Sequence, residues 1–166
     1  EFVHMTKSGE YILFCPSLTR IEVFERTFDS LTNESRYEKN VSKTITLTRP
    51  LFSIKTTSDA STIIVSHKSY PPMISVYNHF IFTKTIQLDT SLSNSPSKFE
   101  PRYISLSANG TICAIAHNYV YSADLTKNGF YVVDISGTTN LPQVFIPYPY
   151  MANIQNFYTQ FIEYSL

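Results

Sequence analysis

Two of the four histidines stand at matching places in a repeated sequence pattern. His67 and His117 each follow the turn position of their repeat, at 60 and 110, by the same spacing. Imidazole binds metal ions and exchanges protons near neutral pH, so the pair could belong to a recurrent ligand-contacting surface. The simpler explanation is that a polar residue ends a strand there, since the first repeat has Pro16 at this place. Adjacent repeats would hold the two rings too far apart to share one metal ion.

Two tyrosines follow the second of these histidines. Tyr119 and Tyr121 stand two positions apart, and tyrosine offers rigid contact area with a polar tip, which protein interfaces favour. Together with His67 and His117, they make up the interaction surface that the sequence predicts. Packing between repeats would explain the tyrosines equally well.

Catalytic motifs are missing from the sequence. It has four glycines and no phosphate loop, Gly-x-Ser-x-Gly, HExxH or EF-hand pattern. Asp134 ends an apolar run and is expected to accept backbone hydrogen bonds at a turn. Cys15 and Cys113 lack metal-ligand spacing, and Cys113 is expected to be a buried free thiol, with a disulfide between the two disfavoured. We therefore predict no catalytic residue, no cofactor and no metal site, and we expect that the protein is not an enzyme.

Three Asn-x-Ser/Thr sequons stand in predicted loops or turns, at Asn33, Asn40 and Asn109. Such sites accept N-linked glycans in secreted proteins. They favour an extracellular or cell-surface location. The two apparently unpaired cysteines favour the alternative, an intracellular assembly.

The elements that would position these residues come from an internal repeat. Gly9, Ala60 and Gly110 each stand in a short polar turn, and each turn leads into a strand of apolar and β-branched residues. The spacing between these turns is about 50 residues, which is the period of a propeller blade. Two further apolar segments follow each turn, at 21–24, 74–77 and 131–134, and at 44–47, 85–88 and 143–146.

Each repeat therefore reads as four short antiparallel strands. This pattern predicts an all-β fold of tandem four-stranded antiparallel blades, which is a partial β-propeller. The two longest insertions, 28–43 and 89–100, are predicted to be polar loops. The predicted units are blade-like repeats at 1–49, 50–100 and 101–150, with 151–166 as the start of a fourth repeat or a capping segment.

The charge balance excludes several partners. The 13 basic and 13 acidic residues cancel, so nothing favours binding to nucleic acid.

No apolar run approaches the length needed to cross a bilayer, so membrane insertion is not expected. The chain opens at Glu1 without a methionine, and we expect it to be a piece of a longer protein.

The third repeat resembles a known family. Residues 129–136 read Gly-Phe-Tyr-Val-Val-Asp-Ile-Ser, and 139–144 read Thr-Asn-Leu-Pro-Gln-Val. This is similar to the LVIVD repeat, whose blades carry a Gly-Leu-x-Val-Val-Asp-Val-Ser strand and then an Asn-Pro turn. The resemblance covers about 103–148, and in the other repeats Phe24 and Tyr77 stand where the aspartate would fall. It implies a WD40-like β-propeller with a scaffold or adhesion role, and it brings no catalytic residues.

About three blades would not close a propeller. Open blade faces and strand edges need covering by other blades, by copies of the chain or by other subunits. The leading hypothesis is therefore a structural or protein-interaction scaffold, with protein subunits, self or other, as partners. A carbohydrate-binding or adhesive cell-surface module and a fragment of a propeller hydrolase are the alternatives.

Overall fold

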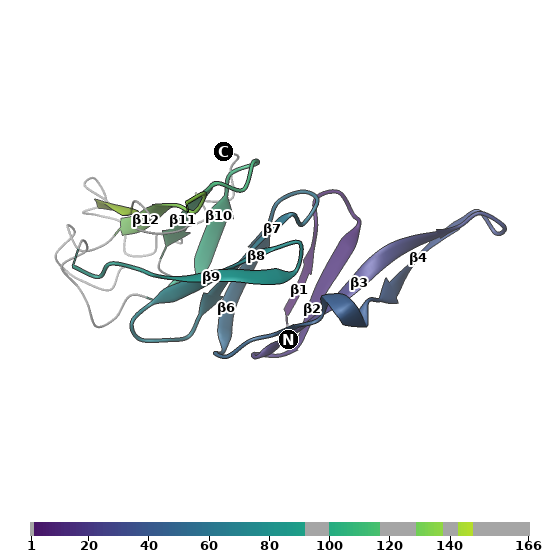
Figure 1. The fold of residues 1–166 in the computed structure, drawn as a ribbon, viewed down its shortest axis with the longest axis horizontal. Coiled ribbons are helices and arrows are strands. Elements are labelled where there is room, and N and C mark those ends of the chain that lie inside the picture. The colour runs from purple at the N-terminus through teal and green to yellow at the C-terminus, as the bar shows by residue number, and fades with distance from the viewer. Residues whose placement is uncertain (1, 92–99, 117–128, 138–142, 148–166) are drawn as a thin grey trace, which may run out of the picture.

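The structure is a computed structural model, and it describes residues 2–91, 100–116, 129–137 and 143–147. In this part of the chain the fold is all-β, with three antiparallel sheets that follow one another along the long axis of the molecule (Figure 1). No helix among the described residues is long and apolar enough to cross a membrane.

Each sheet is built from strands that are consecutive in the chain. In the first sheet the order is β1 (Phe2–Met5), β2 (Tyr11–Ser17), β3 (Arg20–Asp29) and β4 (Glu34–Lys39), and β5 (Ile45–Thr46) pairs with the start of β3 after the 3-10 helix η1 (Val41–Lys43). The second sheet holds β6 (Leu51–Thr56), β7 (Thr62–His67), β8 (Met73–Asn78) and β9 (Ile81–Gln87). The third sheet holds β10 (Tyr103–Leu106), β11 (Ile112–Ala116), β12 (Gly129–Asp134) and β13 (Gln143–Pro147).

The core lies in two layers, one on each side of the second sheet. Because successive side chains of a strand point to opposite faces, β7 serves both layers. Ile63 and Val65 are buried in the cluster shared with the first sheet, and Ile64 is buried in the cluster shared with the third. The run of consecutive apolar residues in β7 therefore reflects a strand that is covered on both faces.

The repeated turns share one backbone conformation. Gly9, Ala60 and Gly110 all have positive φ, at 70°, 58° and 71°. Three residues before each of them, a hydroxyl group accepts a hydrogen bond from the N–H that opens the next strand. These pairs are Thr6 with Tyr11 (3.1 Å), Thr57 with Thr62 (3.0 Å) and Ser107 with Ile112 (2.9 Å).

The register of the third sheet corrects the predicted alignment of repeats. Ile63 pairs with Tyr77 in the second sheet, and the matching residue of the third, Cys113, pairs with Val133. Val133, and not Asp134, is thus the counterpart of Tyr77. The predicted alignment is therefore shifted by one residue. In a strand, a shift of one residue assigns each side chain to the opposite face of the sheet. Asp134 does accept a hydrogen bond of 2.9 Å from the N–H of Ser136, as predicted.

The segment 28–43 is not a polar loop. β3 continues to Asp29 and turns back into β4, and this hairpin projects beyond the rest of the first sheet (Figure 1). At its tip Asn33 has a φ of 58°, and the Asp29 carboxylate accepts the N–H of Leu31 at 2.9 Å. We call residues 26–37 the arm. The arm has the polar composition of a loop, yet its residues form two paired strands whose side chains alternate between the two faces of the hairpin.

Candidate interaction surface

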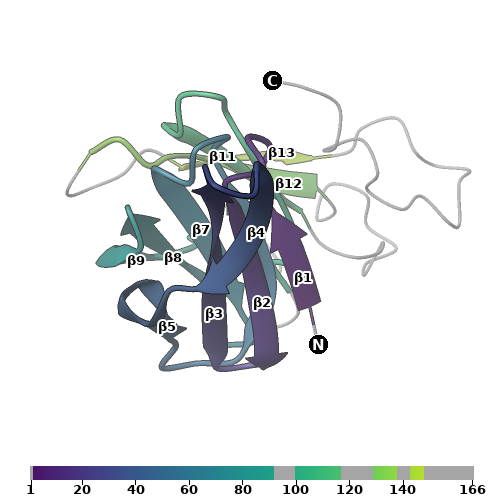
Figure 2. The same ribbon diagram turned by 90° about the vertical axis from the view of Figure 1, so that its right-hand side faces the viewer.

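The outward face of the first sheet carries apolar side chains, and no other described strand packs on it. Val3 pairs with Phe14, Met5 with Ile12, and Ile12 with Phe24, so the five side chains form one contiguous group on the side away from the second sheet. Val3 is 64% exposed and Met5 57%. Figure 2 looks toward this side of the molecule, with β1 to β4 in front of the other sheets. We call these five residues the open face.

The repeat shows what the open face corresponds to. Ile63, Val65 and Tyr77 of the second sheet are buried against the first sheet. Counting from the turn residues Gly9 and Ala60, their counterparts stand at the same register positions of the first sheet but are only half-buried. These counterparts are Ile12, Phe14 and Phe24. The first sheet thus presents, uncovered, the face that the second sheet uses to pack.

Charges beside the open face form ion pairs. Glu22 lies 2.7 Å from Lys39 and 3.2 Å from Arg20. The hydrogen bond from Lys39 is the main reason that the pKa of Glu22 lies below its ordinary value, followed by the nearby positive charges. One carboxylate and two cations thus form an ion-pair cluster next to Phe14, with a net positive charge beside the apolar side chains.

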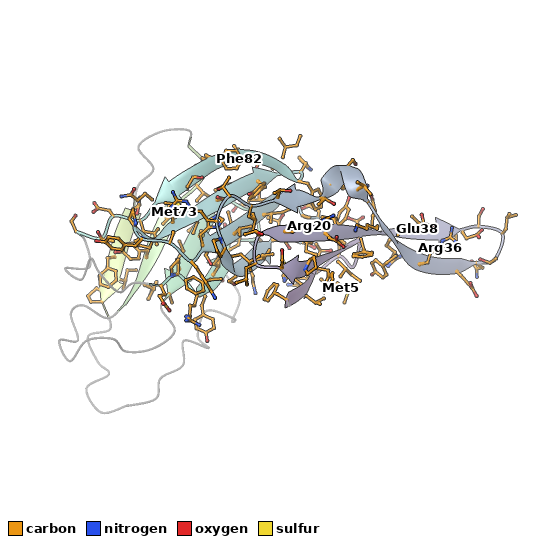
Figure 3. The ribbon with its side chains drawn as sticks, turned by 90° about the horizontal axis from the view of Figure 1, so that it is seen from below. Met5, Arg20, Arg36, Glu38, Met73 and Phe82 are labelled. Atoms are coloured by element: carbon orange, nitrogen blue, oxygen red, sulfur yellow. The ribbon has the colours of Figure 1, made fainter. Side chains whose placement is uncertain are left out.

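The arm extends the open face. Phe24 pairs with Lys39, Arg26 with Tyr37 and Phe28 with Ser35, so one side of the hairpin continues the row of Phe24. Phe28 is largely exposed. The opposite side carries polar and charged residues, namely Glu25, Thr27, Asp29, Glu34, Arg36 and Glu38. Figure 3 places Arg36 and Glu38 on the projecting hairpin. The arm is therefore amphipathic, with its apolar side continuous with the open face.

Tyr37 fixes the arm to the body of the sheet. Its hydroxyl group donates a hydrogen bond of 2.6 Å to the carbonyl oxygen of Gly9. The hydroxyl oxygen of Tyr37 also lies 3.8 Å from the sulfur atom of Met5. The arm is thus held by the first turn, next to the open face.

A charged cluster fixes the base of the hairpin. The Lys43 ammonium lies 3.0 Å from both carboxylate oxygens of Glu25, and Asn40 donates to Glu25 at 2.7 Å. Lys43 also stands 4.6 Å from the ring centre of Tyr11, and Tyr11 packs edge-to-face on Phe80 of the second sheet. The hydrogen bonds from Asn40 and then Lys43 lower the pKa of Glu25. This cluster joins the base of the hairpin to the junction of two sheets.

His67 does not lie on an interaction surface. It is buried on the side of the second sheet that faces the first, with Nε2 2.8 Å from the Ser75 hydroxyl and Nδ1 3.3 Å from the Arg49 carbonyl oxygen. Burial lowers its pKa. The end of β7 lies under the linker between two sheets, which sequence spacing could not reveal. His117, Tyr119 and Tyr121 lie outside the described residues.

The three sequons differ in their surroundings. Asn33 is exposed at the tip of the arm. The Asn40 amide is engaged by Glu25 and Ser42, and Asn109 is exposed, with its oxygen accepting hydrogen bonds within its own turn. Cys15 and Cys113 are both buried free thiols.

The sequence did not identify the open face or the arm as a site. Phe24 was predicted only as part of an apolar strand segment and no role was predicted for Val3 or Met5, because exposure cannot be read from alternation alone. The alternation of Phe24, Arg26 and Phe28 was a signal that β3 continues, and the polar residues after it obscured that signal.

Comparisons with known proteins define the class of fold. No protein-family profile and no curated protein sequence matches the chain. Similar solved structures include a proposed 6-phosphogluconolactonase from Bacteroides uniformis, with 15% identity and a TM-score of 0.52 over 87% of this chain and 40% of that one. A second one, from Bacteroides fragilis, has 8% identity and a TM-score of 0.55 over 89% of this chain and 40% of that one. The β-propeller domain of Cps50 (Swd1) from Myceliophteria thermophila has 14% identity and a TM-score of 0.50 over 89% of this chain and 42% of that one.

The chain therefore has the fold of part of a β-propeller, built of tandem four-stranded antiparallel blades. It spans about two-fifths of the length of these structures. The likeness extends both to proposed 6-phosphogluconolactonases and to the propeller domain of Cps50 (Swd1), and nothing in it singles out the LVIVD repeat.

The expectation that the protein is not an enzyme is contradicted. Two of the structures that share this fold are proposed 6-phosphogluconolactonases, so blades of this kind also occur in proteins proposed to be enzymes. The absence of familiar catalytic motifs was an insufficient basis for that expectation, because function depends on sites and not on fold.

Proposed function

We propose that this chain is a protein-interaction scaffold that works as part of a larger propeller or assembly, with the open face as its contact surface. The observation that carries the proposal is the exposure of Ile12, Phe14 and Phe24, whose counterparts in the second sheet are buried against a neighbouring blade. Blades of a propeller bury their faces only by stacking.

The energetics favour a partner on this surface. Burying apolar surface stabilises a complex by roughly 25 cal/mol for each Å² removed from water. Val3, Met5 and Phe28 are each more than half exposed, so a sheet laid on the open face and the arm would bury several large side chains at once. Contiguous apolar surface of this kind marks interaction sites in folded proteins.

The similarity to larger propellers supports the same proposal. In the described residues the chain carries three blades, and each matched structure is more than twice as long as the part that this chain covers. The Cps50 (Swd1) structure is a β-propeller domain. Further blades or subunits would complete such an architecture here.

Methionine oxidation tests this proposal with an internal control. Met5 is 57% exposed on the open face, and Met73 is 8% exposed in the core. Figure 3 shows both residues. In the isolated chain, hydrogen peroxide should oxidise Met5 rapidly and Met73 slowly. In protein taken from its source in its native assembly, Met5 should become as protected as Met73. Equal oxidation of Met5 in both preparations would mean that nothing covers the open face.

A hydrolase is the second candidate function, because two of the similar propellers are proposed 6-phosphogluconolactonases. The pairing of the Ser75 hydroxyl with His67 at 2.8 Å joins a nucleophile type to a base type, although both residues are buried. The test is hydrolysis of 6-phosphogluconolactone by the purified chain and by its Ser75→Ala variant. Equal rates in the two, or a rate no higher than in buffer, would contradict this candidate.

A further inference from the structure

We infer that the open face receives the third sheet of a second copy of this chain, so that copies associate head to tail. This inference rests on the proposed function, and it names the partner. The observations that carry it are exposed apolar side chains at the other end of the sheet stack, the matching positions of the two faces in the repeat, and their charges.

The second face with exposed apolar side chains lies on the third sheet. Phe145 packs edge-to-face on Tyr131, toward the second sheet. Its neighbours Val144 and Ile146 therefore point to the opposite side, where Ile112 also stands, and the three are 56%, 40% and 41% exposed respectively. We call these three residues the far face. Both ends of the sheet stack thus carry exposed apolar side chains.

The two faces are the two halves of one repeated junction. Leu13 of the first sheet packs toward the second sheet, and its counterpart Ile64 packs toward the third. The next counterpart is Ala114, which shares its side of the third sheet with the far face. The open face corresponds to the other side of this junction, which Ile63 and Val65 form in the second sheet. A second copy placed head to tail would therefore repeat the packing that the chain already uses twice.

One contact inside the chain indicates which residues would meet between copies. The Nε2 atom of His4 lies 3.0 Å from the Thr56 hydroxyl, across the junction of the first two sheets. By register, Ser105 is the counterpart of His4, and Met5 is the counterpart of Thr56. In a head-to-tail pair, Ser105 of one copy should therefore approach Met5 of the other.

The charges favour association of like copies. The chain carries 13 basic and 13 acidic residues, so two copies do not repel each other as a whole. On the arm, Arg26 is exposed beside the open face. Asp134 pairs across strands with Ile112, at the edge of the far face. Opposite charges would thus meet where the arm reaches over the neighbouring copy, and this complementarity distinguishes head-to-tail from face-to-face association.

Paired cysteine variants test this arrangement. The full chain is prepared as Met5→Cys and, separately, as Ser105→Cys, and the two are mixed with a short bismaleimide cross-linker. Cys15 and Cys113 are buried with raised pKa values, so they should react little, and wild type measures that background. We expect cross-linked dimers in the mixture and few in either variant alone. Ile81→Cys, at an exposed position of the second sheet, should give none with Ser105→Cys.

Light scattering over a range of concentrations supplies the second measurement. The wild-type chain should show native masses that are multiples of 19.0 kDa. Phe14→Glu should weaken association at least about tenfold, which corresponds to about 1.4 kcal/mol, and Ile81→Glu should leave it unchanged. Circular dichroism checks that each variant keeps its strands.

Two results would overturn the inference. Efficient cross-linking of Met5→Cys to itself would mean a two-fold, face-to-face dimer. A 19.0 kDa monomer at every concentration, without cross-links, would mean that a second copy is not the partner. In that second case, protection of Met5 in the native assembly would still support the proposed scaffold with a different partner, so the two proposals fail separately.

Discussion

The hydroxyl group of Tyr37 donates a hydrogen bond of 2.6 Å to the carbonyl oxygen of Gly9. This contact joins the arm to the first repeated turn, two segments that the sequence places 28 residues apart. It aligns the apolar side of the arm with the open face, so the two act as one surface.

Tyr37→Phe should loosen the arm without unfolding the sheet. A lost hydrogen bond at an exposed site costs about 0.5–1.5 kcal/mol, so amide hydrogens of β4 should exchange up to roughly tenfold faster, while the global free energy of unfolding changes by about 1 kcal/mol or less. Hydrogen exchange read by mass spectrometry measures this. Tyr70→Phe is the control, because Tyr70 is exposed elsewhere. Unchanged exchange in β4 would show that the contact does not hold the arm.

Gly110→Ala should destabilise the protein more than Gly9→Ala. Both residues have positive φ, which costs an alanine about 1–2 kcal/mol. A methyl group at Gly110 would also lie 2.6 Å from the Thr62 hydroxyl oxygen, whereas at Gly9 its nearest neighbours are 3.9 Å away. Urea unfolding of the two variants compares them directly. Equal losses of stability would mean that the contact between the second and third sheets yields without cost.

Acid should weaken the fold through His67. Burial lowers the pKa of this histidine below its ordinary value of 6.5, so the unfolded chain takes up a proton before the folded chain does. The stability that neutral His67 contributes to the fold is fully present above pH 6.5. It is lost as the pH falls from there toward the pKa of His67 in the folded state, by at most about 1.4 kcal/mol per pH unit.

His4 adds to the loss of stability in acid in the same direction as His67, because burial and then the charge of Lys55 lower its pKa. The double variant with His4→Gln and His67→Gln should therefore lose less stability between about pH 7.5 and 5.5 than wild type. Urea unfolding at several pH values within this window measures the slope. A wild-type slope equal to that of the double variant would contradict the assignment of the acid sensitivity to these two histidines.

Ser66→Ala and Ser75→Ala should have opposite effects on stability. The buried hydroxyl of Ser66 has no hydrogen-bond partner in the structure, and the first and third repeats have Cys15 and Ala116 at its place. Removing it should stabilise the fold by up to about 1 kcal/mol, because an unpaired buried polar group is costly. Ser75→Ala removes the hydroxyl that pairs with the buried Nε2 atom of His67 and should cost about 1–3 kcal/mol. Thermal unfolding compares the pair, and destabilisation by Ser66→Ala would reveal a missing partner for its hydroxyl.

Much of the fold could be predicted from the sequence because the repeat is local. The turns at Gly9, Ala60 and Gly110 and the alternating strands after them indicate four-stranded blades, and the structure has three such sheets, the first with β5 as an additional strand. The register of the third repeat could not be predicted from the sequence. Val132 and Val133 are both apolar, so composition does not decide which of them faces the second sheet, whereas cross-strand hydrogen bonds do.

The candidate site was largely beyond reach of the sequence. His67 has the residue type of a ligand-binding group, yet it is buried by the linker at Arg49. Phe28 and Tyr37 stand in a polar segment and were assigned to a loop, although β3 and β4 hold them on the same side as the open face.

By itself, the sequence determined the type of element, its period and the place of each repeated turn. These follow from side-chain alternation and from turn residues, which act over a few positions of the chain. Only the tertiary structure decided which apolar faces are covered. Ile12 and Ile63 have the same residue type and the same repeat position, and they differ in burial because only Ile63 has a neighbouring sheet against it. Exposure depends on what packs against a face, and that is a long-range property.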